Sequence, residues 1–124
     1  MTPRVVATVL GQLADLRAWG RAGDGRWWAL LSWTVYGNLD AGGNGFVHCS
    51  AWVPASQVTS SADPTQIPLY RLVERFDLPG DTAAWPTPAA SRGRTWHHYG
   101  ALSGRPPGPP GVTSLAGVPA PRVR

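Results

Sequence analysis

RWWALLSWTVY, residues 26–36, predicts the strongest strand in the chain, because it combines three Trp and one Tyr with strict alternation of side-chain type. One set of alternate positions is entirely apolar and comprises Trp27, Ala29, Leu31, Trp33 and Val35. The other set is mixed and comprises Trp28, Leu30, Ser32, Thr34 and Tyr36. Successive side chains of a strand point to opposite faces, so this pattern predicts a β-strand with its apolar face in the core and its mixed face half-exposed.

A second strand is predicted for FVHCSAWV, residues 46–53, after the Gly-rich loop 37–45. Its inward set is Val47, Cys49, Ala51 and Val53, and its outward set is Phe46, His48, Ser50 and Trp52. A loop placed symmetrically over 37–45 fixes the register of the hairpin. The pairs it predicts are Tyr36 with Phe46, Thr34 with His48, Ser32 with Ser50, and Leu30 with Trp52.

The other elements are predicted less sharply. The β-branched stretch RVVATVL (4–10) favours a strand, although the apolar spacing over 5–16 also fits a helix that Gly11 would weaken. GRAGDG (20–25) is a turn, and 54–64 is a turn and loop after Pro54 ends the strand before it. LYRLVERF (69–76) fits either a strand, which we favour, or a helix.

Charge and composition divide the chain near residue 80. Residues 1–80 are neutral overall, and the whole excess of +4 falls in residues 81–124, which contain eight Pro and six Gly. This composition predicts a small β domain over 1–80 and a largely disordered, polyproline-like tail over 81–124. Within the tail, AWPTP (84–88) and TWHHYG (95–100) could fold back onto the domain through their aromatic side chains.

The expected fold class is mainly β, as a small antiparallel SH3-like barrel or curled sheet. Size and hairpin order resemble SH3-like and Tudor-type barrels in shape, without their signature motifs. VLGQLADL (9–16), GRWWALLSW (25–33) and HCSAWVP (48–54) together resemble small Trp-rich proteins encoded in actinomycete genomes. That resemblance covers about the first 58 residues and implies a bacterial, cytoplasmic source but no activity.

The mixed face of the two central strands is the candidate binding site. It gathers an aromatic set made up of Trp28, Tyr36, Phe46, His48 and Trp52. Aromatic side chains on a rigid sheet can stack on bases, enclose a cationic side chain or hold a proline-rich peptide. Two alternatives use the same residues: a second core covered by the tail or by 69–76, and a homodimer interface. We predict that Trp27 and Trp33 lie in the core and that Trp28 makes the contact.

Several chemistries lack support in the sequence. His48 and Cys49 are adjacent and point to opposite faces of a strand, which prevents them from chelating one metal ion together. His97 and His98 have no Cys, Asp or Glu close by, and the Gly-rich loops match no phosphate-loop pattern. We therefore expect no catalytic site, metal or cofactor. A single Cys excludes an intramolecular disulfide, and neither a signal peptide nor about 18 continuous apolar residues is visible, so a cytoplasmic location is expected.

The expected function is non-catalytic binding of a protein partner through the aromatic face, the Pro-rich tail or both. The alternative is a nucleic-acid-binding module in which aromatic rings stack on bases and tail arginines contact phosphates. The candidate phosphate contacts are Arg92, Arg94, Arg105, Arg122 and Arg124. The neutral charge of residues 1–80 places nucleic acid second. No membrane partner is expected, and the homodimer stays open.

Overall fold

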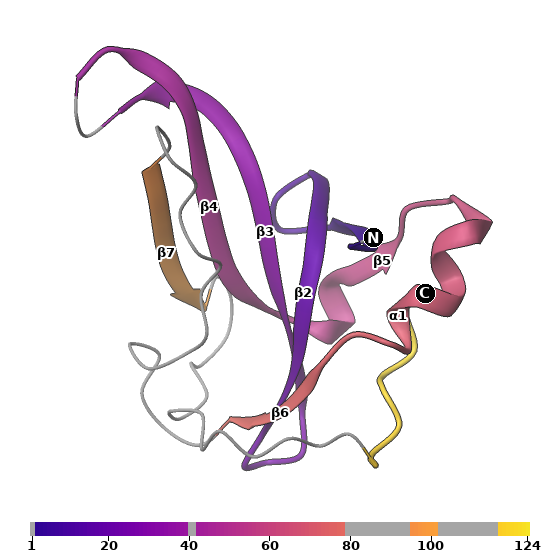
Figure 1. Ribbon diagram of the computed structural model, residues 1–124. Helices are drawn as coiled ribbons and strands as arrows, with labels where there is room; N and C mark the ends of the chain where they lie inside the picture. Colours follow the sequence, from indigo (N-terminus) through magenta and orange to yellow (C-terminus); the bar gives the residue numbers. More distant parts are fainter. Residues whose placement is uncertain (1, 40–41, 79–94, 102–116) are drawn as a thin grey trace.

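The computed structural model describes residues 2–39, 42–78, 95–101 and 117–124 (Figure 1). The part described is mainly β, as predicted, with one short α-helix, α1 (Ile67–Tyr70), and two single 3-10 turns, η1 (Ala55–Gln57) and η2 (Pro64–Gln66). The strands are β1 (Arg4–Ala7), β2 (Gln12–Ala22), β3 (Trp27–Asn38), β4 (Asn44–Pro54), β5 (Val58–Ser60), β6 (Arg75–Leu78) and β7 (Thr95–Ala101).

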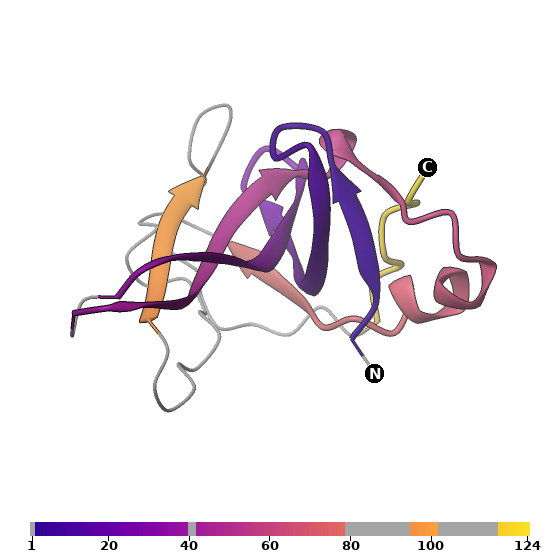
Figure 2. The same ribbon diagram turned by 90° about the horizontal axis from the view of Figure 1, so that it is seen from above.

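All seven strands belong to one sheet. Its order is β5-β1-β2-β3-β4-β7, and β6 pairs with β2 beside that path. The pairings from β5 to β4 are antiparallel, whereas β2 with β6 and β4 with β7 are parallel. Figure 2 shows how strongly the sheet curls. The antiparallel class is thus confirmed in the form of an open, curled sheet, and the described strands do not close into an SH3-like barrel.

The hairpin of β3 and β4 has the register that the sequence predicts. Tyr36 pairs with Phe46, and the ladder continues without interruption as far as Trp28 opposite Pro54. Each strand runs two residues further into the connecting loop than expected, to Asn38 and from Asn44. Because the loop stays symmetric about its centre, the added pairs leave the register unchanged.

The N-terminal strand is shorter than predicted and is followed by a strand that the sequence analysis missed. β1 ends at Ala7, and a turn follows in which the Gly11 N–H donates to the Ala7 carbonyl at 2.9 Å. Gly11 has φ of +66°, a conformation that glycine adopts without strain. β2 then covers Gln12–Ala22 and so includes the first three residues of the turn predicted for 20–25. Because 4–7 and 12–16 are both strand, the helical alternative over 5–16 is wrong.

A β-bulge in β2 explains why its pattern was not recognised. Leu16 pairs with Leu31 and Ala18 with Leu30, which leaves Arg17 as the extra residue. A bulge shifts the alternation of faces by one residue. Leu16 and Trp19 consequently lie in one core, whereas Ala18 lies on the opposite face of the sheet.

Both alternatives for residues 69–76 are realised in part. Leu69 and Tyr70 end helix α1, which has Pro68 in its first turn, where the missing proline N–H costs no hydrogen bond. After a turn, Arg75 and Phe76 begin β6. The switch from helix to strand within eight residues accounts for the mixed pattern.

Two segments of the predicted tail lie against the sheet. β7 contains TWHHYG and pairs with β4, with Trp96 opposite His48. In the C-terminal segment, Ala120 and Val123 pack on the core, and the Ser60 N–H donates to the Arg124 carbonyl. AWPTP (84–88) and most other residues of the predicted tail, 81–94 and 102–116, lie outside the described residues, where disorder stays a prediction.

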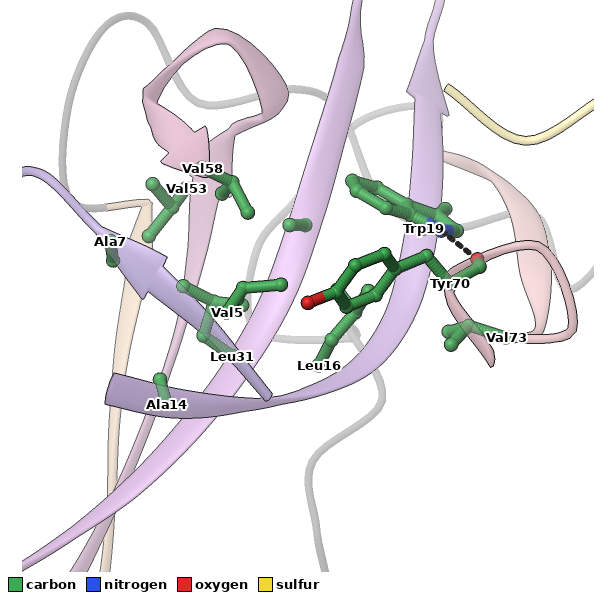
Figure 3. Packing of buried hydrophobic residues seen from close by; sticks show 11 residues of the cluster. Val5, Ala7, Ala14, Leu16, Trp19, Leu31, Val53, Val58, Tyr70 and Val73 are labelled. Atoms are coloured by element: carbon green, nitrogen blue, oxygen red, sulfur yellow. Dashed lines mark hydrogen bonds between the residues drawn. The ribbon is translucent and has the colours of Figure 1, made fainter. Parts of the chain in front are cut away.

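Buried side chains form two clusters on the two faces of β3. The main core is drawn in Figure 3 and consists of Val5, Ala7, Ala14, Leu16, Trp19, Ala29, Leu31, Val53, Val58, Tyr70 and Val73. The second core consists of Ala18, Ala22, Trp28, Leu30 and Trp52, with Phe76 of β6 packed against it. The sheet is therefore covered on both sides along the inner half of β3.

Tyr70 connects the helix to two strands and to the residue that follows a third (Figure 3). Its carbonyl accepts a hydrogen bond from Trp19 Nε1 of β2 at 3.1 Å. Its hydroxyl donates to the Arg4 carbonyl of β1 at 2.7 Å and accepts from the Ser61 N–H, which follows β5, at 3.3 Å. The ring itself is 4% exposed and lies in the main core.

Replacing Tyr70 by Phe tests this arrangement. The ring stays, but the hydroxyl that bonds Arg4 and Ser61 is lost, so we expect the free energy of unfolding to fall by about 1–3 kcal/mol. Urea unfolding followed by Trp fluorescence measures the change. The matched control is Tyr36→Phe, at a tyrosine that is 70% exposed, where we expect a change within about 0.5 kcal/mol. Equal effects of the two substitutions would contradict the role of the Tyr70 hydroxyl.

The turn that leads into α1 generates a prediction about pH. Asp63 caps η2, and its Oδ1 accepts from the Thr65 hydroxyl at 2.7 Å and the Thr65 N–H at 3.0 Å. These hydrogen bonds hold the pKa of Asp63 below its usual 3.8, and the bond from the Thr65 hydroxyl contributes most to the shift. The stabilisation is complete above about pH 3.8 and is lost as the pH falls through the lower pKa of the folded state.

Carbon-13 NMR titration of the carboxyl group checks this directly. We expect the Asp63 resonance to titrate below pH 3.8, and Thr65→Val to move its midpoint upward by removing the hydroxyl donor. An unchanged midpoint in the variant would show that the hydroxyl does not cause the shift.

Candidate functional site

Three of the five residues of the predicted aromatic face are buried. Trp28 is 1% and Trp52 0% exposed, and His48 is 8% exposed. The prediction that Trp28 makes the contact is therefore wrong, and the alternative of a second core is correct for these tryptophans. Their burial depends on β2 and on Phe76, which lies within 69–76, one of the two segments considered as a cover. Trp27 and Trp33, predicted as core, are half-buried against the main core.

The other two residues of the set, Tyr36 and Phe46, are exposed. Their side chains are 70% and 54% accessible to solvent. The rings meet edge to face, with centroids 5.9 Å apart and planes at 83°. This geometry is one that aromatic pairs prefer, and the hairpin register holds the two residues opposite each other. The structure thus keeps an exposed aromatic pair from the predicted face.

The exposed pair lies on a projecting ribbon, here called the arm and defined as residues 34–38 and 44–46. β2 pairs with β3 no further than Ser32, and β7 pairs with β4 from Val47 onward. Beyond these points the described residues provide no third strand, so the arm is two-stranded. Figures 1 and 2 show it extending past the rest of the sheet.

Residues 34–38 and 44–46 contain no charged side chain, and Asp40 in the loop that joins them lies outside the described residues. The two strands of the arm read TVYGN (34–38) and NGF (44–46). Val35, predicted to face the core, is 40% exposed on the face opposite Tyr36, because the main core does not reach this far. Natural edge strands are usually protected by charges, proline or bulges. The described arm has none of these, and no described strand pairs with its β3 edge.

Local packing stiffens the arm. The Leu39 N–H donates to the Gly43 carbonyl at 3.0 Å at its tip. A Cβ on Gly45 would stand 2.9 Å from Leu39 Cδ1, so glycine is what allows the leucine to lie across the strand. At the base, Thr34 Oγ1 lies 3.2 Å from His48 Nδ1, at hydrogen-bonding distance. The aromatic pair therefore lies between a hydrogen bond at the tip and a polar contact at the base.

Among the described residues, those with catalytic or metal-binding potential are not brought together. Cys49 is 2% exposed and points away from His48, as alternation predicts. Within the described ranges no group of three or more His, Cys, Asp or Glu side chains is close enough to hold a metal ion. The side chains of His97 and His98 lie outside what the structure describes.

The predicted phosphate contacts are divided between described and undescribed residues. Arg92, Arg94 and Arg105 lie outside the described ranges. Arg122 and Arg124 are exposed in the C-terminal segment, and Arg122 lines a cavity that also contains Arg71. Sequence reasoning missed Arg71 because nothing in the local pattern places it beside the C-terminal segment, some 50 residues further along the chain.

Comparison with known proteins gives no information about the function of this site. No protein-family model, curated protein or solved structure matches the chain. Among the described residues, no helix has the length and apolar character that crossing a membrane requires.

Stability measurements distinguish the buried from the exposed aromatic residues. We expect Trp28→Ala to lower the free energy of unfolding by about 3–5 kcal/mol, because it leaves a cavity in the second core. Tyr36→Ala removes a mostly exposed ring and should cost about 1 kcal/mol or less. Urea unfolding of both variants tests this. Similar losses would mean that Trp28 is not packed as described.

Proposed function

We propose that this protein is a non-catalytic interaction module that binds a protein partner through the arm. The observation that carries the proposal is the exposed Tyr36–Phe46 pair on an uncharged, two-stranded ribbon. The part of the predicted aromatic face that stays accessible is thus smaller than the sequence suggested, and it lies at the projecting end of the hairpin.

The chemistry of the pair suits a protein interface. Aromatic residues are enriched in the centres of such interfaces, and tyrosine is frequent among the residues that dominate binding energy. The edge-to-face contact and the fixed register leave little side-chain freedom to lose on binding, which favours affinity. The pair therefore resembles a preformed anchor.

The backbone of the arm suggests how the partner binds. An extended segment of the partner could add to the β3 edge over residues 34–38 and receive main-chain hydrogen bonds. Its side chains would then alternate between the face of Tyr36 and the face of Val35. Since the arm is uncharged, the matching segment is expected to be extended and apolar rather than acidic or basic.

Nucleic acid fits this surface less well. Base stacking on Trp28 and Trp52 would require exposed rings, and both are buried. The arm has no cationic side chain that could contact phosphate. The hypothesis of nucleic-acid binding depends mostly on tail arginines that lie outside the described residues. We accordingly place the protein partner first.

Site-specific photocrosslinking tests the proposal in cells that express the full chain. Benzoylphenylalanine replaces Tyr36 in one variant and Leu72, which is 76% exposed and remote from the arm in sequence, in the control. We expect a discrete adduct from position 36, identified by mass spectrometry, that is absent from position 72 and lost with Phe46→Ala.

Direct binding measurements then give the size of the effect on affinity. With the identified partner purified, we expect Phe46→Ala to weaken the Kd about tenfold or more, and Leu72→Ala to leave it within about twofold. An adduct with nucleic acid, or equal labelling from positions 36 and 72, would overturn the proposal. An adduct formed solely with a second copy of this chain would replace the protein partner by the homodimer.

A further inference from the structure

A cavity of about 690 Å³ lies between the α1–β6 segment and the C-terminal segment. Its lining residues come from these two parts of the chain: Ile67, Tyr70, Arg71 and Arg75 from the first, and 117–123 from the second. The volume falls within the range of about 300–1,000 Å³ that is typical of small-molecule sites. The cavity is remote from the arm in the sequence and shares no residue with it.

Both walls of the cavity are fixed to the main core. Tyr70 anchors the first wall through its hydrogen bonds to Trp19, Arg4 and Ser61. Ala120 and Val123 pack against the main core from the second wall. The space between the walls is therefore held open by the fold.

The lining combines apolar side chains with arginines. Ile67, Val118, Pro119, Ala120, Pro121 and Val123 supply the apolar surface. Arg71, Arg75 and Arg122 supply positive charge, and none of the described residues that line this cavity is Asp or Glu. Glu74, the acidic residue nearest in sequence, lines a different depression with Leu69 and Leu72. The local charge of the lining is accordingly positive.

The three arginines of the cavity have different roles. Arg75 Nη1 donates to the Arg71 carbonyl at 2.7 Å and to the Val73 carbonyl at 3.3 Å, so its guanidinium braces the turn that carries Arg71. Arg71 and Arg122 are exposed, and neither forms an ion pair with a described residue. These two guanidinium groups are thus available to an incoming anion.

We propose that this cavity binds a small organic anion with an apolar body and a carboxylate or phosphate group. Arg71 and Arg122 bind the anionic group, since a guanidinium donates paired hydrogen bonds that match either oxyanion. The apolar lining takes the body of the ligand, and Arg75 acts as a positioning residue for Arg71. The site is independent of the protein-binding arm.

An NMR titration of the full-length, nitrogen-15-labelled protein tests the proposal. The probes are 1-naphthoate, 1-naphthyl phosphate and the neutral 1-naphthol at low ionic strength. We expect at least one anion to shift the amide resonances of residues 67–75 and 117–123 and to bind about fivefold tighter than naphthol, or more. Which of the two anions binds distinguishes a carboxylate site from a phosphate site, and either result supports the proposal.

Variants then assign the contacts. We expect Arg71→Gln and Arg122→Gln each to weaken binding of the anion up to about fivefold and the double variant to lose the preference over naphthol. The matched control is Arg26→Gln, which removes an arginine that is paired with Asp24 at 2.7 Å and lies outside the cavity. The amide spectrum of each variant without ligand confirms that it folds. Equal binding of naphthol, equal loss with Arg26→Gln, or shifts confined to the arm would overturn the proposal.

Discussion

The hydrogen bonds of Tyr70 are the constraint on which the rest of the structure depends. α1 is a single turn, too short to be stable alone, and it is held where Trp19 donates to the Tyr70 carbonyl and the Tyr70 hydroxyl meets β1. The segment that leaves this turn runs directly into β6, whose Phe76 packs on the second core. The buried Tyr70 thus positions both the wall of the cavity formed by α1 and the strand β6, whose Phe76 covers the second core.

The bulge at Arg17 has a comparable effect on β2. It reverses the alternation between Leu16 and Ala18, which places Trp19 in the main core, where it reaches Tyr70. Without the extra residue, Trp19 would lie on the face opposite Leu16. On the same edge of β2, β1 pairs with residues before the bulge and β6 with residues after it. The bulge in β2 therefore separates the part of this edge that pairs with β1 from the part that pairs with β6.

The two candidate binding regions arise where this packing ends. β3 and β4 continue beyond their neighbours, so the alternation that buries Trp28 exposes Tyr36 on the same face eight residues later. The cavity arises because the C-terminal segment packs on the core through Ala120 and Val123 without closing against Arg71. The arm is apolar and uncharged, whereas the cavity is lined by arginines, and the two therefore suit ligands of different chemistry.

The mainly β class and the β3–β4 hairpin with its register could be predicted from the sequence, because alternation and a symmetric loop are local properties of the chain. The sequence also placed Trp28, Tyr36, Phe46 and Trp52 on one face, and that assignment is consistent with the observed pairing. What covers a face depends on residues distant in sequence. The burial of Trp28 and Trp52, the bulge in β2 and the meeting of Arg71 with Arg122 were accordingly decided by the tertiary structure alone.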